Sequence, residues 1–360
     1  MFESVSRAKD APDHYHVNLQ ITLSGDLNIA ALDRAWGNFL ARHRVLRMSV
    51  LPFSMASGLA VISSEAKNPL RVVSTSGSVF ERTQYLLALD AAEPFDIFNG
   101  PLIRAQITEL SHARFLLLLS NHHLVLDGWS MPIMVDEVFK LYAEEVRILS
   151  NANSQRSTVT RLDAAFDWGS YLGWLQRQDR TISENYWKAY LESLESVSRV
   201  IFPTPTKNAK GIANAWLTLD QDTSESIKTF AQQQGLTQAT VYQAGFALLL
   251  AELSRLDEVI IGSVRSGRSC NLPGIERAIG FFLSTLPQRF LIDPAARTVD
   301  WLHSYQLEHA EQEQYAHLGL ARIQALAHGN AFVDKRQRNQ SCNCIGSNSA
   351  GNIYQACFRN

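Results

Sequence analysis

The stretch Asn121-His122-His123-Leu124-Val125-Leu126-Asp127-Gly128-Trp129-Ser130 decides how the rest of this sequence is interpreted. Just before it, Phe115 to Leu119 form an uninterrupted apolar run that is typical of a buried strand. The hydroxyl of Ser130 can cap a helix that we expect to run to about Val146. The pattern therefore predicts a loop between a strand and the positive N-terminal end of a helix, a place that suits anionic intermediates.

The residue types in this loop suit acyl transfer. One imidazole can handle a proton, and an aspartate four residues after the second histidine can hold the loop through a buried ion pair. The glycine lets the backbone come close to a developing oxyanion. The bare His-x-x-x-Asp spacing is common by chance, and a lone histidine beside an apolar strand is more often structural than catalytic. A functional assignment therefore needs a motif that is matched over more residues than these.

That longer match exists. The residues from Asn121 to Ser130, in their strand–loop–helix frame, resemble the HHxxxDG active-site signature of condensation domains in nonribosomal peptide synthetases. Other segments resemble further motifs of this family and occur in the family's order. They are the RHxxLR-like Arg42 to Arg47, the aromatic segments Phe166 to Leu175 and Glu184 to Leu194, the strand and SGR turn from Asp257 to Arg268, and the IGxFxNTLP-like Ile279 to Pro287. The resemblance extends from residue 1 to about residue 334.

The resemblance implies an α/β fold of two chloramphenicol-acetyltransferase-like lobes in a V-shaped pseudo-dimer, with the second lobe incomplete. The N-terminal lobe with the HHxxxDG motif is expected at residues 1–162, linker helices at 163–195, and a partial C-terminal lobe at 196–334. Residues 335–360 have no helical or strand periodicity, so we expect a disordered or out-of-family tail. Since the family's opening helix and last motif have no counterpart, the chain is expected to be truncated at both ends.

Hydrophobic patterning gives the individual elements. We expect a strand at His16 to Leu23 and helices at Ile29 to Arg42, Thr223 to Gln234 and Thr237 to Leu253. The polar stretch Ser150 to Gln155 is typical of a surface linker.

The activity implied by the resemblance is amide bond formation between a donor aminoacyl or peptidyl thioester and the amine of an acceptor aminoacyl group. Both groups would arrive on phosphopantetheine arms of donor and acceptor peptidyl carrier proteins, next to an adenylation domain. Three alternatives stay open: an inactive truncated remnant with at most carrier-protein docking, a free-standing acyltransferase, and an epimerisation domain, which shares the double histidine. The continuation Asp127-Gly128-Trp129-Ser130 favours condensation over epimerisation.

The family's pattern also assigns the catalytic residues. His123 is expected to take a proton from the attacking amine, or else to position that amine and stabilise the zwitterionic intermediate. Gly128 is expected to offer its backbone to the oxyanion. His122 is expected to be structural, with its side chain turned away from the substrate.

Four further residues are expected to support the loop. Asp127 would pair with an arginine and hold the loop in shape, instead of acting as a base; losing one partner of a buried ion pair costs about 3–5 kcal/mol. Arg47 and Arg268 are the candidate partners, and for each the alternative is a solvated surface position. Trp129 is expected to pack the loop against the core.

Composition excludes several other classes of function. A formal charge of −2 gives no electrostatic footprint for nucleic acid or an anionic membrane. The longest apolar stretch, Ala244 to Ala251, is too short to span a bilayer, and the N-terminus does not have the pattern of a signal peptide. Four cysteines argue against a disulfide framework and favour the reducing cytoplasm. No phosphate-binding glycine loop or zinc-ligand spacing occurs, so we expect the domain itself to bind no metal or cofactor.

Overall fold

A computed structural model describes residues 15–51, 60–63, 68–149, 162–192, 194, 218–327, 344–347 and 353–354. The chain divides into two compact units. The first consists of Met1–Trp174 with Cys270–Phe282, and the second of Leu175–Ser269 with Leu283–Asn360. The first unit therefore includes a segment, Cys270–Phe282, that the predicted boundaries place in the second lobe. This segment belongs there because its backbone is hydrogen-bonded to residues 123–130, which we call the histidine loop.

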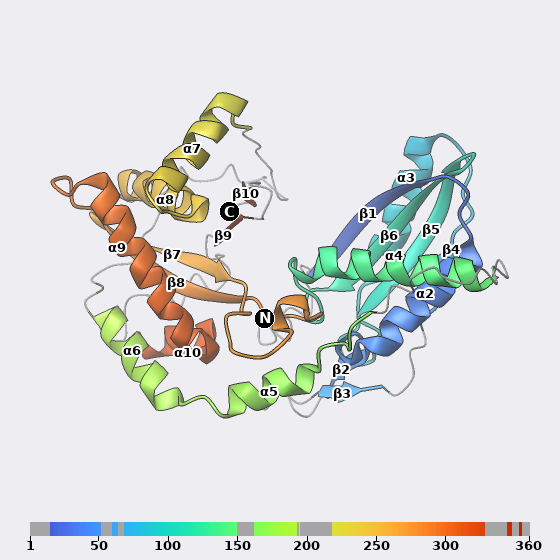
Figure 1. Cartoon of the computed structure of the whole chain (residues 1–360), viewed down its shortest axis with the longest axis horizontal. Helices are drawn as coiled ribbons and strands as arrows, with labels where there is room; N and C mark the ends of the chain where they lie inside the picture. The colour runs from blue at the N-terminus through green and yellow to red at the C-terminus, as the bar shows by residue number, and fades with distance from the viewer. Residues whose placement is uncertain are drawn as a thin grey trace, which may run out of the picture. The chain divides into compact units, whose positions relative to one another are not determined.

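A four-stranded sheet in the order β1-β6-β5-β4 forms the centre of the first unit (Figure 1). Its strands are β1 (His16–Ser24), β6 (Arg114–His122), β5 (Ile103–Ser111) and β4 (Arg71–Val72). Both neighbours of β6 run antiparallel to it, whereas β4 runs parallel to β5. A separate two-stranded sheet pairs β2 (Met48–Val50) with β3 (Ala60–Ile62).

The internal position of β6 explains its uninterrupted apolar run. Leu117 and Leu119 face the larger core of the unit, whereas Leu116 and Leu118 face a smaller core that includes Leu86. Successive side chains of a strand point to opposite faces, so a strand covered on both faces needs apolar residues at every position. The strands predicted at residues 16–23 and 115–119 are confirmed.

Helices cover both faces of this sheet (Figure 1). The larger core contains the apolar faces of α2 (Ile29–Arg42) and α4 (Ser130–Leu149), and α3 (Val79–Ala91) supplies Leu86 on the other face. The side chain of Asn28 caps α2 by accepting the N–H of Ala31 at 2.9 Å. The predicted helix Ile29–Arg42 is confirmed, with Leu32, Trp36, Phe39 and Leu40 on its buried face. α4 continues three residues beyond the predicted end at Val146. A 3-10 turn, η1 (Arg44–Arg47), follows α2.

The second unit has its own sheet, in the order β10-β9-β7-β8. Its strands are β7 (Glu258–Arg265), β8 (Ser284–Leu291), β9 (Cys344–Ser347) and β10 (Ile353–Tyr354). Its helical elements are α6 (Arg180–Glu192), α7 (Gln221–Gln233), α8 (Gln238–Ser254), α9 (Thr298–Glu311), η4 (Gln312–Leu318) and α10 (Leu320–Leu326). α5 (Trp168–Gln176) includes the residues at which the first unit ends and the second begins. η3 (Ile275–Arg277) lies in Cys270–Phe282, the second segment of the first unit.

The helices predicted in this half are found within about two residues of their expected bounds. Thr237, expected to be the first residue of a helix, is the N-cap of α8, and its hydroxyl accepts the N–H of Thr240 at 3.0 Å. The two aromatic helical segments predicted between residues 163 and 194 are α5 and α6.

The C-terminal part of the chain departs from one expectation. Where no strand was expected, Cys344–Ser347 pairs in parallel with β7, and Ile353–Tyr354 pairs with it in turn. The other residues of the predicted tail, and the predicted linker Ser150 to Gln155, lie outside the described residues. Among the residues that are described, no helix combines the length and the apolar character needed to cross a bilayer.

Candidate active site

The histidine loop starts where β6 ends, between the two neighbouring strands. On one side, the N–H of His122 donates to the carbonyl of Leu102 at 2.8 Å, just before β5. On the other side, the N–H of His123 donates to the carbonyl of Tyr15 at 2.7 Å, just before β1. The backbone of both histidines is therefore fixed from two strands at once.

The ring of His123 has a defined tautomer. Its Nδ1 lies 2.9 Å from the carbonyl oxygen of Leu126. Because a carbonyl only accepts hydrogen bonds, Nδ1 must carry the proton, and in the neutral ring Nε2 is left with a lone pair. The ring is partly exposed and meets the edge of Phe281, with centroids 5.6 Å apart and planes at 87°. His123 can therefore accept a proton or a hydrogen bond through Nε2.

His122 has different surroundings. Its side chain is 1% exposed, and its Nδ1 accepts the N–H of Leu124 at 3.1 Å. The ring of Tyr15 lies against it at a tilted angle, with centroids 5.8 Å apart. These contacts hold the loop in shape, and the structural role of His122 stays a prediction.

Asp127 is buried and serves as an acceptor for the backbone. One carboxylate oxygen accepts the N–H of Ser130 at 2.9 Å and its hydroxyl at 2.8 Å. The other oxygen accepts the N–H of Phe282 at 3.0 Å. With 1% of its surface exposed, the carboxylate is committed to holding the loop and is not presented to a substrate.

Ser130 differs from its predicted role as a cap. It is the first residue of α4, and its hydroxyl contacts the backbone of Gly280, in the segment 270–282. The hydroxyl lies 2.9 Å from the carbonyl of Gly280 and accepts the N–H of the same residue at 3.1 Å. The N–H of Asp127 also donates to the carbonyl of Gly280, at 3.2 Å. The loop and residues 280–282 are thus joined by several buried hydrogen bonds.

Gly128 is exposed, and no contact with the part of the chain that the structure describes requires a glycine there. Its φ is not in the left-handed region, and a Cβ built at this position meets no atom within 4 Å. Space next to the backbone is what a bound substrate would need. Trp129 differs from the predicted core packing: 51% of it is exposed, because its indole N–H reaches out to the carbonyl of Glu276 at 3.2 Å.

The two candidate partners of Asp127 lie in different units. Arg47, in the first unit, donates to the main-chain carbonyls of Ser63 and, at 3.4 Å, Ala41. Arg268, in the second unit, is 8% exposed and donates to the carbonyl of Ser266 at 3.2 Å. The surface alternative is therefore wrong for Arg268. Which arginine pairs with Asp127 stays a prediction.

The RHxxLR-like segment joins α2 to α4 through a buried glutamate that the motif did not indicate. Glu137 accepts from the Nε of Arg42 at 2.5 Å and lies 3.0 Å from the Nε2 of His43. Burial disfavours its charge, but the hydrogen bond from His43 and the charges of both partners hold the pKa of Glu137 below its usual value. This cluster orients α4, whose first turn follows the histidine loop.

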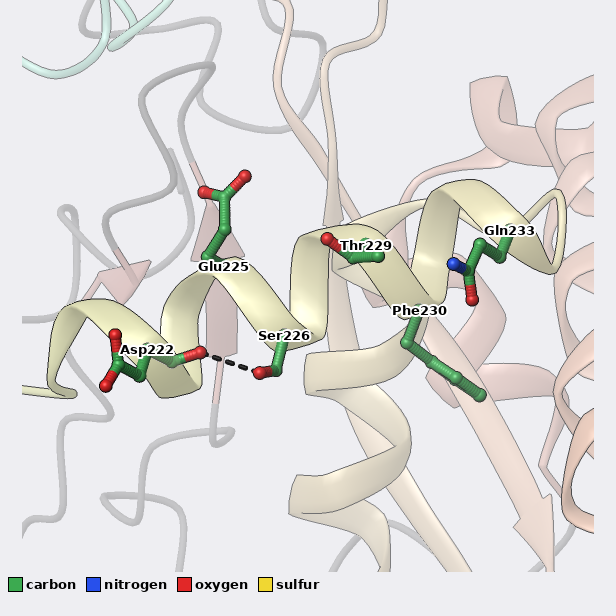
Figure 2. A pocket seen from close by; sticks show the side chains of 6 residues that line it. All are labelled: Asp222, Glu225, Ser226, Thr229, Phe230 and Gln233. Carbon is green, nitrogen blue, oxygen red and sulfur yellow. Dashed lines mark hydrogen bonds between the residues drawn. The ribbon is translucent and has the colours of Figure 1, made fainter.

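Two cavities lined by described residues lie away from His123. One, of about 480 Å³, is an open groove along one face of α7, lined by Asp222, Glu225, Ser226, Thr229, Phe230 and Gln233 (Figure 2). The other, of about 210 Å³, lies near β4 and includes Val72, Thr75, Arg82 and Thr108. Among the described residues, no group of three or more His, Cys, Asp or Glu side chains could hold a metal ion.

Comparison with known proteins shows which family this chain belongs to. A family model described as "Condensation domain" matches residues 4–334, which is close to the end predicted from the motifs. A linear gramicidin synthase from Brevibacillus parabrevis is 30% identical over 321 residues, covering 86% of this chain and 4% of that protein. Bacitracin synthase 1 of Bacillus licheniformis is 28% identical over 323 residues, covering 87% of this chain and 6% of that protein. The chain thus spans only a small part of these relatives.

Solved structures show the same fold. The X-domain from teicoplanin biosynthesis matches with a TM-score of 0.73 at 20% sequence identity, covering 91% of this chain and 73% of that one. The first condensation domain of the calcium-dependent antibiotic synthetase, in complex with a substrate analogue, matches with a TM-score of 0.70 at 18% identity, covering 92% and 77%. The mixed α/β fold predicted from the sequence is confirmed by these neighbours.

Proposed function

This chain belongs to the Condensation domain family, and from that premise we propose that it joins two carrier-bound groups by an amide bond. The donor is an aminoacyl or peptidyl thioester and the acceptor is the free amine of a second aminoacyl thioester. Both would be carried on phosphopantetheine arms of peptidyl carrier proteins, the donor and acceptor partners of this domain, which also works next to an adenylation domain. The domain itself needs no bound cofactor for this reaction.

The observation that carries the proposal is the tautomer of His123. Its Nδ1–H is used by the carbonyl of Leu126, so Nε2 is the atom available to an amine. The ring is partly exposed, whereas neighbouring His122 is buried and occupied by the backbone. We therefore infer that His123, and not His122, handles the attacking amine.

The reaction is balanced without a further reagent. The acceptor nitrogen attacks the carbonyl carbon of the donor thioester, an N–C bond forms, and the C–S bond breaks to release the phosphopantetheine thiol. The proton lost by the nitrogen ends on the departing sulfur. His123 Nε2 takes that proton in transit or holds the N–H while the charged intermediate forms, and both roles use the same lone pair.

The oxyanion of the tetrahedral intermediate needs donors. The backbone of Gly128 is exposed, has open space beside it and lies two residues before α4 begins. An N–H at this place, supported by the positive end of a 20-residue helix, would stabilise negative charge. Asp127 contributes by fixing the loop, since its oxygens are already occupied by Ser130 and Phe282.

The test is a single-turnover assay with the chain, a donor aminoacyl carrier protein and an acceptor aminoacyl carrier protein, with products identified by mass spectrometry. The donor carries deuterium at its α-carbon. The proposal predicts a dipeptidyl product on the acceptor carrier protein, which disappears when the acceptor amine is blocked by acetylation. Loss of deuterium without a dipeptide would indicate epimerisation. No product from the folded chain would indicate a remnant without activity.

A further inference from the structure

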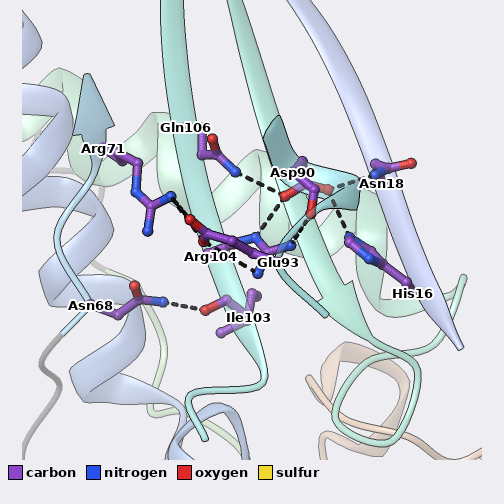
Figure 3. A network of polar contacts seen from close by, with 9 residues as sticks. All are labelled: His16, Asn18, Asn68, Arg71, Asp90, Glu93, Ile103, Arg104 and Gln106. Atoms are coloured by element: carbon purple, nitrogen blue, oxygen red, sulfur yellow. Dashed lines mark hydrogen bonds and ion pairs between the residues drawn. The ribbon is translucent and has the colours of Figure 1, made fainter. Parts of the chain in front are cut away.

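A buried carboxylate outside the histidine loop gathers polar side chains from two strands. Asp90, near the end of α3, is 0% exposed (Figure 3). From β1, the Nε2 of His16 lies 2.7 Å from its Oδ2, and the amide of Asn18 donates to the same oxygen at 2.9 Å. From β5, Arg104 and Gln106 donate to Oδ1 at 2.6 and 2.8 Å. Asp90 therefore joins β1 to β5.

The carboxylate of Asp90 remains charged over the working pH range. Burial raises the pKa of Asp90, but the contacts with His16 and Arg104 outweigh it and hold this pKa well below its usual range. Arg104 also donates to the main-chain carbonyl of Asp90 at 2.7 Å and lies 4.3 Å from the centroid of the Phe95 ring. The contact of Arg104 with Asp90 is therefore a charge-assisted hydrogen bond, and His16 and Asn18 attach β1 to the same carboxylate.

β1 and β5 are the strands that flank β6, and they hold its end. The residue before His16 is Tyr15, whose carbonyl accepts the N–H of His123. The carbonyl of Leu102, two residues before Arg104, accepts the N–H of His122. In the register of the sheet, His16 and His122 are direct partners. The contacts of Asp90 therefore lie one and two residues from the carbonyls that fix the two histidines.

We propose that Asp90 and His16 are positioning residues for His123. By joining β1 to β5 beside the end of β6, they set the place of the Tyr15 carbonyl and, through it, the backbone of His123. The role in catalysis rests on the function proposed above, whereas the effect on the geometry of His123 does not. Neither residue touches the substrate in this account.

Loss of the His16 side chain should change the rate of amide formation with little change in the binding of the carrier-bound acceptor. Without the His16 imidazole, the start of β1 loses its contact with Asp90, and the Nε2 of His123 shifts relative to the amine. A misplacement of a catalytic group by about 1 Å can reduce a rate up to about a hundredfold. We expect His16→Ala to lower kcat by about tenfold, while KM for the carrier-bound acceptor changes less than about twofold.

The experiment compares four variants of the whole chain by kinetics and by ¹⁵N NMR of the histidine rings. His16→Ala removes the contact, and His16→Gln restores a donor at nearly the same reach as Nε2. Asn18→Ala weakens the same cluster from an exposed position on β1. Leu86→Ala is the control, since it removes a buried apolar side chain of the same helix that makes none of the polar contacts of Asp90.

The proposal predicts that His16→Ala moves the His123 ring resonances and lowers kcat, that Asn18→Ala does both more weakly, and that His16→Gln restores both. Leu86→Ala should lower the melting temperature and leave the His123 resonances in place. Unchanged His123 resonances in both His16→Ala and Asn18→Ala, or equal shifts in Leu86→Ala, would overturn it. If the parent makes no amide while the resonances move as predicted, the function proposed above fails and the positioning role stands.

Discussion

The carboxylate of Asp127 accepts the main-chain N–H of Phe282 at 3.0 Å, across 155 residues of sequence. Its other oxygen serves Ser130 at the start of α4. One buried side chain therefore fixes the shape of the histidine loop and attaches residues 280–282 to it. The ring of Phe281, which lies against His123, is placed by the same attachment.

Removing this carboxylate should destabilise the first unit. Asp127→Ala removes the carboxylate that accepts from two N–H groups and a hydroxyl, and we expect the free energy of unfolding to fall by about 2–4 kcal/mol. Chemical denaturation measures this loss. Asp136→Ala is the matched control, because its carboxylate on α4 is 48% exposed and should change stability by less than about 0.5 kcal/mol. Equal stability of the Asp127 variant and its parent would contradict the structural role.

Two glycines near the loop should respond in opposite ways to alanine. At Gly128 a Cβ meets open space, so Gly128→Ala should leave the free energy of unfolding within about 0.5 kcal/mol of the parent. At Gly280 a Cβ would lie 2.9 Å from the rings of Phe282 and Trp168, so Gly280→Ala should be destabilising by about 2 kcal/mol or more. Thermal and chemical unfolding of the two variants compare these directly.

The Gly128→Ala variant also separates an effect on activity from an effect on stability. If substrate approaches the backbone at Gly128, the added methyl should lower the rate of amide formation about tenfold or more while the fold is unchanged. A fully active Gly128→Ala variant would show that this backbone is not used.

His309 in the second unit should stay neutral under ordinary conditions. Burial lowers the pKa of its imidazole from 6.5 to about 3, and the nearby charge of Arg265 acts in the same direction. The unfolded chain takes up a proton as the pH falls below 6.5, whereas the folded chain does not until about pH 3. Stability should therefore fall with decreasing pH in this window, by up to about 1 kcal/mol per pH unit from this group.

NMR titration of the histidine side chains checks this prediction. The resonance of His309 should not move between about pH 7 and pH 5, and His309→Gln should have a shallower dependence of stability on pH. In Arg265→Met, where a buried positive charge is removed, the pKa of His309 should rise. A midpoint of about 6.5 in the parent would show that the ring is solvated.

Local patterns were sufficient to predict most of the elements. The spacing of Leu32, Trp36, Phe39 and Leu40 marks the buried face of α2, and the uninterrupted run before His122 marks a strand covered on both sides. These features depend on residues a few positions apart, so the spacing of apolar residues along the sequence is enough to predict them. Motif order then located the histidine loop and indicated the family.

Contacts between distant residues could not be predicted in this way. The sequence gives no sign that Ser130 would bind Gly280, 150 residues away, instead of capping its own helix. The cluster around Asp90 joins residues from α3, β1 and β5, whose proximity depends on the strand order of the finished sheet. Both cases involve polar side chains whose partners are fixed only by tertiary structure, and hydrophobic patterning carries no information about them.

In the function proposed above, His123 supplies the nitrogen that handles the attacking amine. The most direct measurement is the rate of dipeptide formation between donor and acceptor carrier proteins by the parent, by His123→Ala, and by His112→Ala, which removes an exposed histidine in the turn between β5 and β6. We expect product from the parent and from His112→Ala, and a rate at least about a hundredfold lower for His123→Ala. Equal rates for all three, with folding confirmed, would contradict it.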